Sequence, residues 1–283
     1  MAKVDLHIHS TASDGRFSPE EIVQKAAALG LTVIALADHD SVDGVAPALA
    51  AAKAFSNLKV IPNVEISTDT PVGEVHILGY FVDHTDKELK VSLERFRDSR
   101  QIRARKMVAK LKGLGINIDW PRVQQIAGTG SIGRPHVAQA MLEKGYIATF
   151  RDAFDKYIGY GGPAYVEREK MTPEEAVALI ARANGLSALA HPFTVDDPEV
   201  FITQLKPAGL TSIEAYYKDY NEQKRKTLVS IADKHSLIAT GGSDYHGLDD
   251  NNEIMMGNAG VPEEVIEQLF ALARQRGLKT ISQ

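Results

Sequence analysis

Short apolar runs alternate along the chain with longer amphipathic stretches, which is the pattern of βα units and of a mostly parallel sheet or barrel. The runs expected to form strands are residues 3–9, 31–37, 58–62, 75–81, 163–166, 186–190, 211–216 and 237–240. Several of them are followed at once by His, Asp or Glu. Because α/β barrels place catalytic groups on the loops after the carboxyl ends of their strands, this pattern predicts a functional site at that end.

Three helices have starts that can be recognised in the sequence. Ser18-Pro19-Glu20-Glu21 and Thr172-Pro173-Glu174-Glu175 each combine an N-cap hydroxyl, a proline at the first helical position and a glutamate at the third. Pro262-Glu263-Glu264 opens a third helix of this kind. Because the first turn of any helix favours the same capping residues, we interpret the similarity of these three segments as independent helix caps and not as an internal repeat.

The strand rhythm is interrupted between about residues 94 and 162, where only helical stretches are expected, at 95–113, 135–145 and 150–158. We therefore predict a barrel formed by residues 1–93 and 163–283, with a helical insertion domain at 94–162 that caps it. Basic residues recur at helical spacing in the first of these stretches, as Arg97, Arg100, Arg103 and Lys106. For most of them a solvated helix face is the expected role.

Composition and charge narrow the classes of function. Of the 283 residues 44% are hydrophobic and 24% charged, which are ordinary proportions for a folded globular protein. With 32 Lys and Arg against 37 Asp and Glu, the formal charge of -5 favours neither duplex nucleic acid nor an anionic membrane. The absence of cysteine excludes disulfides, thiolate metal sites and a cysteine nucleophile. Without a signal-peptide pattern or a membrane-length apolar run, a cytoplasmic enzyme is expected.

Histidines and carboxylates are spaced as metal ligands would be. His7 and His9 lie two apart on an expected strand, so their side chains share one face, and Asp244 and His246 repeat that spacing after the last strand. First and last strands are neighbours in a closed barrel. Further candidates lie at or after other strands, namely Asp14, His39, Glu65, His76 and His191. Each of these has a structural interpretation when taken alone, whereas the whole set indicates a metal site. Asp5, Asp38 and Asp40 are expected to orient the ligating rings, and for Glu214 a place in the site and a structural role are equally expected.

These motifs resemble the polymerase and histidinol phosphatase (PHP) family. The resemblance rests on His7-Ile8-His9-Ser10, Asp14-Gly15, Ala37-Asp38-His39-Asp40, Glu65-Ile66-Ser67, His76-Ile77-Leu78-Gly79, Ala190-His191-Pro192 and Gly242-Ser243-Asp244-Tyr245-His246. Gly133-Arg134-Pro135-His136, with Tyr165-Val166, is similar to the trpH-type branch of metal-dependent phosphoesterases. The resemblance implies an α/β fold, a distorted seven-stranded β/α barrel that binds three divalent metal ions at the carboxyl ends of its strands.

The same resemblance implies how the ligands divide among the ions. One ion would take His7, His9, Glu65 and Asp244; a second would share Glu65 and add His76 and His191; the third would take Asp14, His39 and His246. Glu65, Asp244 and His246 are the expected catalytic residues. Other branches of the family have histidine where Asp14 stands, and the harder carboxylate oxygen moves the third site away from a strict preference for zinc. Mn²⁺ is favoured by resemblance, with Zn²⁺ and Fe²⁺ as alternatives.

Arg134 and His136 are the expected substrate-binding residues. Arg134 precedes a proline and therefore lies in extended backbone beside a helix start, where its guanidinium and free N–H groups can hold a phosphate. The resemblance points to nucleoside 3′,5′-bisphosphates and RNA 5′ ends, so the leading hypothesis is a phosphoesterase acting on small nucleotides or short oligonucleotides. The alternatives are a histidinol-phosphate or sugar-phosphate phosphatase, an amidohydrolase acting on C–N bonds, and a noncatalytic nucleic-acid-binding module. The oligomeric state stays open.

Overall fold

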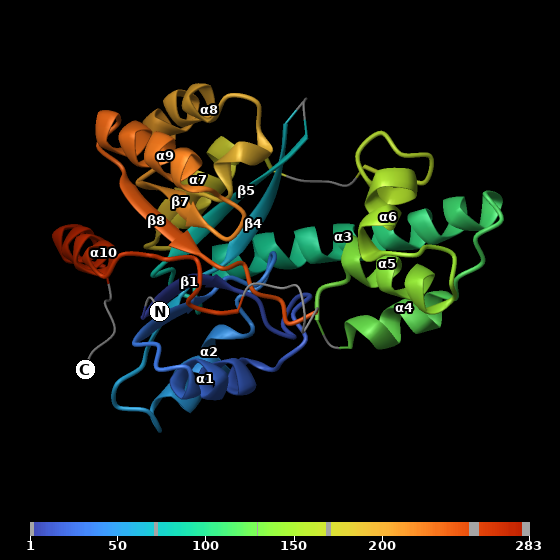
Figure 1. Cartoon of the computed structure of the whole chain (residues 1–283), viewed down its shortest axis with the longest axis horizontal. Helices are drawn as coiled ribbons and strands as arrows, with labels where there is room; N and C mark the ends of the chain where they lie inside the picture. The colour runs from blue at the N-terminus through green and yellow to red at the C-terminus, as the bar shows by residue number, and fades with distance from the viewer. Residues whose placement is uncertain (1–2, 71–72, 129, 168–170, 249–254, 279–283) are drawn as a thin grey trace.

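The computed structural model describes residues 3–70, 73–128, 130–167, 171–248 and 255–278, and these form an α/β barrel with a helical insertion (Figure 1). The strands are β1 Val4–Ile8, β2 Val33–Leu36, β3 Lys59–Pro62, β4 Glu65–Thr70, β5 Gly73–Tyr80, β6 Leu186–Leu189, β7 Ser212–Tyr217 and β8 Ile238–Gly242. The α-helices are α1 Pro19–Ala28, α2 Val45–Ala52, α3 Lys87–Gly113, α4 Trp120–Ala127, α5 Arg134–Glu143, α6 Phe150–Ala153, α7 Pro173–Arg182, α8 Pro198–Leu205, α9 Glu222–Lys234 and α10 Glu264–Gln275. In this part of the chain, no helix combines the length and hydropathy that a membrane crossing requires.

The strands form two sheets that are joined at both ends. β1, β2 and β3 are parallel, whereas β4 to β8 form a mixed sheet in which β5 is antiparallel to both of its neighbours. Parallel bridges from Ile8 to Tyr245 and from His39 to Glu65 connect the sheets. The first and last strands are therefore neighbours, as the sequence predicts. Gly242 makes this approach possible, because a Cβ at this position would collide with the backbone of His7.

Two differences from the expected strands concern the insertion and β4. Residues 163–166 form turns instead of a strand, since the N–H of Ala164 donates to Tyr157 and that of Tyr165 to Gly162. Residues Glu65–Thr70 form a strand that was not expected, pairing with β5 in antiparallel register. One expected strand is absent and one unexpected strand is present, so the described residues contain eight strands, whereas the family resemblance implied a seven-stranded barrel. A two-residue break at Asn63 and Val64 separates β3 from β4.

The predicted helix caps are present at two of the three starts. Ser18 and Thr172 each accept a hydrogen bond from the third residue of their helix, and Glu21 and Glu175 complete both capping boxes. These caps fix where α1 and α7 begin, and thereby how both helices pack on the barrel. The third start differs, because α10 begins at Glu264 without a side-chain cap.

Helix α3 belongs to both the barrel and the insertion. It begins at Lys87, eight residues before the expected start, because the side chain of Asp86 caps it by accepting from Leu89 N at 2.8 Å. Leu89 and Leu93 pack in the barrel core, whereas Met107 and Leu111 pack in a separate hydrophobic cluster. That second cluster contains only residues between 104 and 166. The expected boundary at residue 94 therefore lies inside a continuous helix (Figure 1).

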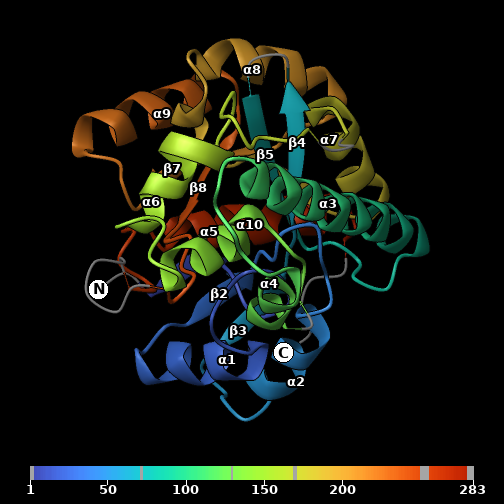
Figure 2. The same cartoon turned by 90° about the vertical axis from the view of Figure 1, so that its right-hand side faces the viewer.

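The insertion is built from more helices than the sequence indicated. α5 corresponds to the stretch expected at 135–145, and the stretch expected at 150–158 is the short α6 followed by a π-helical turn at Phe154–Ile158. Helix α4 was not expected. Seen from the insertion side, α4, α5 and α6 lie in front of the strands, beside α3 (Figure 2).

Candidate metal centre

All nine predicted ligands meet at one end of the barrel. Most of them follow strands directly: His9 and Asp14 come after β1, His39 after β2, His191 after β6, and Asp244 with His246 after β8. His7 lies on β1, Glu65 begins β4, and His76 lies in the middle of β5. His76 reaches the site from inside its strand because β5 runs antiparallel to its neighbours, so its carboxyl end is not at the site.

The carboxylate of Glu65 lies at the centre of this cluster. Its Oε1 is 2.8 Å from His76 Nδ1 and 3.0 Å from His191 Nε2. Its Oε2 is 3.3 Å from the Nε2 atoms of both His7 and His9, and 3.0 Å from His39 Nδ1. One fully buried carboxylate thus contacts five imidazole rings, with its two oxygens facing different groups.

Asp244, which follows β8, contacts two of these rings, His7 and His9, and also His246. Its Oδ1 lies 3.1 Å from His9 Nε2, 3.5 Å from His7 Nε2 and 3.6 Å from His246 Nδ1. Its Oδ2 accepts hydrogen bonds from the hydroxyl of Tyr217 at 2.9 Å and from Lys218 Nζ at 3.1 Å. Asp244 therefore presents one oxygen to the cluster, while β7 and the residue after it hold the other.

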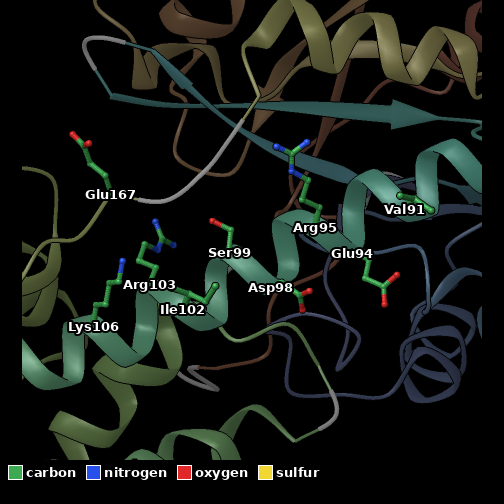
Figure 3. A pocket seen from close by; sticks show the side chains of 9 residues that line it. All are labelled: Val91, Glu94, Arg95, Asp98, Ser99, Ile102, Arg103, Lys106 and Glu167. Atoms are coloured by element: carbon green, nitrogen blue, oxygen red, sulfur yellow. The ribbon is translucent and has the colours of Figure 1, made fainter.

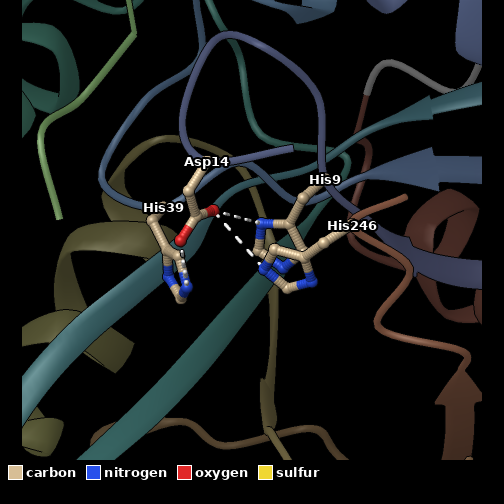
Figure 4. Close-up of side chains that lie close together, drawn as sticks. All are labelled: His9, Asp14, His39 and His246. Carbon is tan, nitrogen blue, oxygen red and sulfur yellow. Dashed lines mark ion pairs between the residues drawn. The ribbon is translucent and has the colours of Figure 1, made fainter. Parts of the chain in front are cut away.

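Asp14 is the third carboxylate of the centre, and it forms a group with His9, His39 and His246 (Figure 4). Its Oδ1 is 3.4 Å from His246 Nε2 and 3.7 Å from His9 Nδ1, and its Oδ2 is 3.9 Å from His39 Nε2. These separations are mostly longer than hydrogen bonds. They leave the side chains facing a common space, as ligands around an ion would.

The chemistry of these residues fits divalent cations. Three groups have ligand atoms that all lie within 4.8 Å of one another: His9, Asp14, His39 and His246; His7, His9 and Glu65; and His39, Glu65 and His76. Several buried polar atoms of the centre have no hydrogen-bond partner, namely Asp14 Oδ1, Glu65 Oε2, His39 Nδ1 and His191 Nδ1. Buried polar atoms without partners are costly, and a bound cation satisfies them. Imidazole and carboxylate without thiolate suit Mn²⁺, Fe²⁺ or Zn²⁺.

The electrostatics separate the rings into two kinds. Burial disfavours a charged His9, but the adjacent carboxylates of Asp244 and Glu65 outweigh burial and raise its pKa to about 10. Burial lowers the pKa of His39 to about 3, and the nearby carboxylates of Glu65 and Asp14 oppose this only in part. Glu65 itself is buried, yet the surrounding His39 and His7 hold its pKa well below the usual range. The carboxylates are therefore charged at neutral pH, as metal ligands must be.

Glu214 on β7 orients two of the ligands. Its Oε1 lies 2.9 Å from His7 Nδ1, and its Oε2 accepts from the backbone N–H of His191 at 2.8 Å. A proton on His7 Nδ1 leaves Nε2, which faces Glu65 and Asp244, free to coordinate. The sequence left the role of Glu214 undecided. Its position near the end of an expected strand was the available signal.

The three aspartates that were expected to orient rings hold loops instead. Asp38 accepts from Ser10 N, Ser10 Oγ and Ser13 Oγ at 2.7–2.8 Å. Asp5 accepts from the N–H groups of Ser243 and Gly257 at 2.9 and 2.8 Å. In the part of the chain that the structure describes, neither carboxylate accepts a hydrogen bond from a ligating ring, because backbone N–H groups face both of them. They fix the loops after β1 and β8 that carry ligands.

Asp40 connects the centre with the insertion. Its Oδ1 accepts from Ser67 N at 2.9 Å, and its Oδ2 accepts from Arg100 Nε of α3 at 2.6 Å. Arg100 also donates to the hydroxyl of Ser67. Asp40 has a left-handed backbone with φ of 49°, as do His191 at 30° and Asp244 at 50°. Residues other than glycine rarely adopt this conformation, and its presence at three loops of one site is typical of functional strain.

The solvated face expected for α3 is wrong for two of its arginines. Arg100 and Arg103 are buried, because Arg100 pairs with Asp40 and Arg103 with Glu74 at 3.1 Å. Arg97 is partly exposed and pairs with Asp43 at 2.6 Å. Arg103 and Lys106 line a cavity of about 530 Å³ along α3, opposite Glu167 (Figure 3). This cavity contains none of the nine ligands.

The two expected substrate-binding residues lie at the start of α5. Arg134 forms an ion pair with Glu74, which stands two residues before His76 on β5 and so on the same strand face. His136 is buried, and its Nδ1 accepts from the N–H of Gly133 at 2.8 Å. The structure therefore brings both residues beside the centre, but each already has a protein partner.

Tyr217 and Lys218 were missed by the sequence analysis. Both donate to Asp244, and the side chain of Lys218 retains 19% of its exposure at the edge of the centre. Burial and the charge of Asp244 raise the pKa of Tyr217, so its hydroxyl stays protonated and donates. A polar Tyr-Lys pair at a strand end has no spacing signal of its own, and only the closure of β8 beside β7 reveals it.

Comparisons with known proteins agree with this geometry. A model of the PHP domain matches residues 5–189. A 3′,5′-nucleoside bisphosphate phosphatase of Chromobacterium violaceum is 34% identical over 251 residues, covering 87% of this chain and 88% of that protein. The 5′-3′ exoribonuclease Rnm of Salmonella typhimurium is 31% identical over 255 residues, covering 86% of this chain and 84% of that protein.

Two solved structures resemble the whole chain. One is a protein of Bifidobacterium adolescentis, provisionally assigned as a metal-dependent phosphoesterase, with a TM-score of 0.87, 27% identity and coverage of 99% and 98% of the two chains. The other is named an amidohydrolase, from Chromobacterium violaceum with bound sulfate and no metal, with a TM-score of 0.85, 31% identity and 97% coverage of each chain. With the cluster of buried imidazoles and carboxylates at its barrel end, the chain belongs to the PHP domain family of metal-dependent phosphoesterases.

Proposed function

We propose that this enzyme hydrolyses the phosphate ester of a small nucleotide, removing the 3′-phosphate from a nucleoside 3′,5′-bisphosphate and trimming short oligonucleotides or RNA 5′ ends. The observation that carries the proposal is the position of Arg134, a guanidinium held beside the ligand cluster by Glu74, two residues from His76. A substrate with two phosphates has one for the cluster and one for this arginine. The names of the two similar proteins, a bisphosphate phosphatase and an exoribonuclease, support the same substrates.

We further propose that the centre holds three divalent ions, with Mn²⁺ as the favoured metal. One site would comprise His7, His9, Glu65 and Asp244; a second Glu65, His76 and His191; the third Asp14, His39 and His246. The two oxygens of Glu65 face different rings, which supports its role as the shared ligand. His9 lies within reach of both Asp14 and Asp244, so its ring stands between the first and third sites.

When bound, such ions would activate a water molecule and neutralise the charge on the phosphoryl oxygens. The protein's own residues prepare the site for this chemistry. Glu214 keeps the coordinating nitrogen of His7 directed at Glu65 and Asp244. His246 Nδ1 lies 3.0 Å from the carbonyl oxygen of Asp244, so a proton held there leaves Nε2 facing Asp14.

Asp244 and its neighbours arrange the exposed side of the centre. Tyr217 and Lys218 hold Asp244 Oδ2, so only Oδ1 is directed at the rings. The partly exposed ammonium of Lys218 also places a positive charge where an anionic phosphoryl group enters. Glu65, Asp244 and His246 remain the proposed catalytic residues, because Glu65 contacts five rings of the cluster and Asp244 Oδ1 lies 3.6 Å from His246 Nδ1.

The insertion at 94–162 is proposed to act as a cap that selects the substrate. Its helix α5 supplies Arg134 and His136 beside the centre, and its residues from 104 onward have a hydrophobic cluster of their own. A cap with its own core can vary in sequence without disturbing the metal ligands, which all lie in the barrel. Arg100 of α3 is the exception, because it is bonded to Asp40 beside His39.

A phosphate-release screen tests the proposed function. Mn²⁺-loaded protein is assayed with nucleoside 3′,5′-bisphosphates, mononucleotides, sugar phosphates, histidinol phosphate and short 5′-phosphorylated RNA, with Glu65→Gln protein as the control for contaminating phosphatases. The bisphosphate should have the highest kcat/KM. A higher value for histidinol phosphate or a sugar phosphate would replace this function with that alternative. Ammonia release from amide substrates without phosphate release would favour the amidohydrolase reaction, and no turnover with retained RNA binding would favour a noncatalytic module.

A further inference from the structure

A second cavity, of about 560 Å³, opens between the loop after β1 and the first turn of α5. Asp14, Arg16, His136 and Gln139 are among its polar lining residues, and Ile126, Pro135, Phe150 and Leu248 supply apolar surface. Asp14 is also a member of the metal-ligand group with His39 and His246, so this cavity adjoins the metal centre. Its size falls within the roughly 300 to 1,000 Å³ that small-molecule sites occupy.

Close backbone packing holds the two walls of this cavity together. The insertion loop before α5 touches the loop after β1 at Gly130, where a Cβ would lie 2.5 Å from the carbonyl oxygens of both Thr11 and Ser13. Ser13 is in turn fixed by its hydroxyl, which donates to Asp38 at 2.7 Å. The spacing between the insertion and the barrel is therefore set at this edge before any ligand enters, which lowers the cost of binding.

The polar atoms of the cavity define what it can bind. Because His136 Nδ1 accepts from Gly133 N at 2.8 Å, the proton of the neutral ring is on Nε2, which makes that nitrogen a hydrogen-bond donor. Asp14 belongs to the metal-ligand group, and the cavity also has three uncharged polar lining residues, Thr11, Ser13 and Gln139. Among the lining residues Arg16, which is exposed, is the only Lys or Arg. The cavity thus suits an uncharged group with apolar faces and an acceptor on its edge.

We propose that this cavity binds the nucleobase of the substrate, which rests on the proposed nucleotide function. A base has flat apolar faces for the side chains of Phe150, Ile126 and Leu248, and ring nitrogens or carbonyl oxygens that accept from His136. Arg134 lies one residue from the lining residue Pro135 and is paired with Glu74 on β5. At the start of α5, Arg134 would therefore bind the second phosphate, and the adjoining cavity would bind the base. The base and the two phosphates of a nucleoside bisphosphate would thus each have a site, and the three sites are neighbours.

The experiment compares two substrates that differ only in the base. kcat/KM is measured for adenosine 3′,5′-bisphosphate and for the abasic 1-deoxyribose 3,5-bisphosphate, in native protein and in Phe150→Ala, Leu248→Ser and Ile102→Ala. Leu248 is 51% exposed, so its substitution leaves the core intact if Phe150→Ala disturbs the insertion. Ile102 is the matched control, an apolar residue that is 55% exposed on α3 and outside this cavity.

Native protein should prefer the adenosine substrate, and Phe150→Ala should lower its kcat/KM by about 5- to 150-fold, the range that removal of a base–aromatic contact gives. Leu248→Ser should lower it less. Turnover of the abasic substrate should stay within about twofold in all variants, and Ile102→Ala should change neither substrate. Quenching of 2-aminopurine riboside fluorescence by native protein, lost in Phe150→Ala, gives a readout without turnover.

Two failures can be distinguished. Equal kcat/KM for the adenosine and abasic substrates in native protein, or equal losses on both in Phe150→Ala and Leu248→Ser, would overturn the base site while leaving the bisphosphate phosphatase intact. If neither bisphosphate is hydrolysed but another phosphate ester is, the proposed function fails first. Fluorescence quenching by the riboside would then still show whether the cavity binds a base, and its absence would overturn the inference as well.

Discussion

The guanidinium of Arg134 on α5 is ion-paired with the carboxylate of Glu74 on β5, so the arginine expected to hold a phosphate is joined to the barrel. Arg103 of α3 contacts the other oxygen of Glu74 at 3.1 Å. One carboxylate thus orients two guanidiniums from two helices of the insertion. A phosphate that binds Arg134 must share it with Glu74 or displace that carboxylate, and this competition sets the affinity.

Removal of Arg134 should therefore affect only substrates with a second phosphate. Arg134→Ala is expected to lower kcat/KM for a nucleoside 3′,5′-bisphosphate. The decrease should correspond to a loss of about 2 to 4 kcal/mol of transition-state stabilisation, as for truncated charge pairs. Arg134→Lys keeps the charge but loses the planar fork, so it should act mainly through KM. The matched monophosphate, assayed in parallel, should barely change. Equal losses on both substrates would mean that Arg134 serves the scissile phosphate or the fold.

The partner of Arg134 provides a complementary variant. Glu74→Gln removes the negative charge that competes with the second phosphate, so KM for the bisphosphate should fall while KM for the monophosphate stays constant. The prediction is checked by steady-state kinetics on both substrates at equal metal content. If KM for the bisphosphate rises instead, the role of Glu74 is to position Arg134 and the two do not compete.

Glu65→Gln should abolish activity more completely than any other single change in the centre. The substitution removes a charge that contacts five rings, and the loss should exceed the ~100-fold that changes to groups around the ligands produce at most. Metal analysis after dialysis should show fewer ions per chain. Near-native turnover with full metal content would disprove the shared role of Glu65, and intact secondary structure by circular dichroism is the control.

Many ligands of this centre could be predicted from local sequence patterns. His7 and His9 share a strand face because strands have a period of two, and His39, His191, Asp244 and His246 follow strands in a pattern that parallel barrels impose. Glu65 and His76 were recognised although β4 was missed. Alternating polar residues hid that strand, since Glu65 and Ser67 face the site and the buried arginine instead of solvent.

The parts that sequence did not reveal depend on contacts between distant segments. Arg100 and Arg103 follow the same helical spacing as the more exposed Arg97 and Lys106. Their burial depends on two carboxylates from distant segments, Asp40 in the loop after β2 and Glu74 on β5. Tyr217 and Lys218 become neighbours of Asp244 through the packing of β8 on β7. Asp38 was assigned to the rings because carboxylates usually orient them, whereas here free backbone N–H groups were closer.

Asp14→Ala should separate the proposed third ion from the others. Asp14 contacts His9, His39 and His246 but none of the ligands of the second group, His76 and His191. We expect the variant to lose about a third of its bound metal after dialysis, since one of three sites would be removed. Asp14→His, which introduces the ligand found in other branches of the family, should restore metal content and shift preference toward Zn²⁺. A loss of all metal in Asp14→Ala would contradict the division into sites.

Metal binding should release protons, because His9 is charged in the metal-free protein. Its pKa is raised to about 10, so the ring is protonated at pH 7 and must lose its proton before it coordinates. The charged form stabilises the metal-free fold fully below the unfolded value near 6.5, and this stabilisation is lost as the pH rises toward 10. Metal-free protein should therefore lose stability over that range while Mn²⁺ affinity increases.

Calorimetry in buffers of different ionisation enthalpy measures this release. At pH 7 the observed enthalpy of Mn²⁺ binding should depend on the buffer, and the dependence should decrease in His9→Gln protein. Denaturant unfolding of metal-free protein at pH 6.5 and pH 9 measures the free energy of unfolding, which should be lower at pH 9. An affinity that does not change with pH would show that His9 is neutral before metal binds.

The last prediction concerns where the insertion can be removed. Arg100 of α3 donates to Asp40 and Ser67 in the barrel, whereas residues from 104 onward pack among themselves. Arg103 and Glu167 line the same cavity, so the chain returns beside α3 at this level and a short linker can span the gap (Figure 3). Replacement of residues 104–162 by a Gly/Ser linker should leave a folded, metal-binding protein that hydrolyses an activated aryl phosphate but has lost its preference for nucleotides.

A matched deletion that begins at residue 94 tests whether Arg100 matters to the barrel. It removes the guanidinium that holds Asp40, and the loss of this buried charge pair beside His39 should lower both stability and metal content. Metal analysis and thermal unfolding of the two deletions give the comparison. If the shorter deletion also abolishes folding and metal binding, residues 104–162 belong to the core of the enzyme and not to a separable cap. If both deletions behave alike and bind metal normally, the expected boundary at 94 is sufficient and the contact between Arg100 and Asp40 is dispensable.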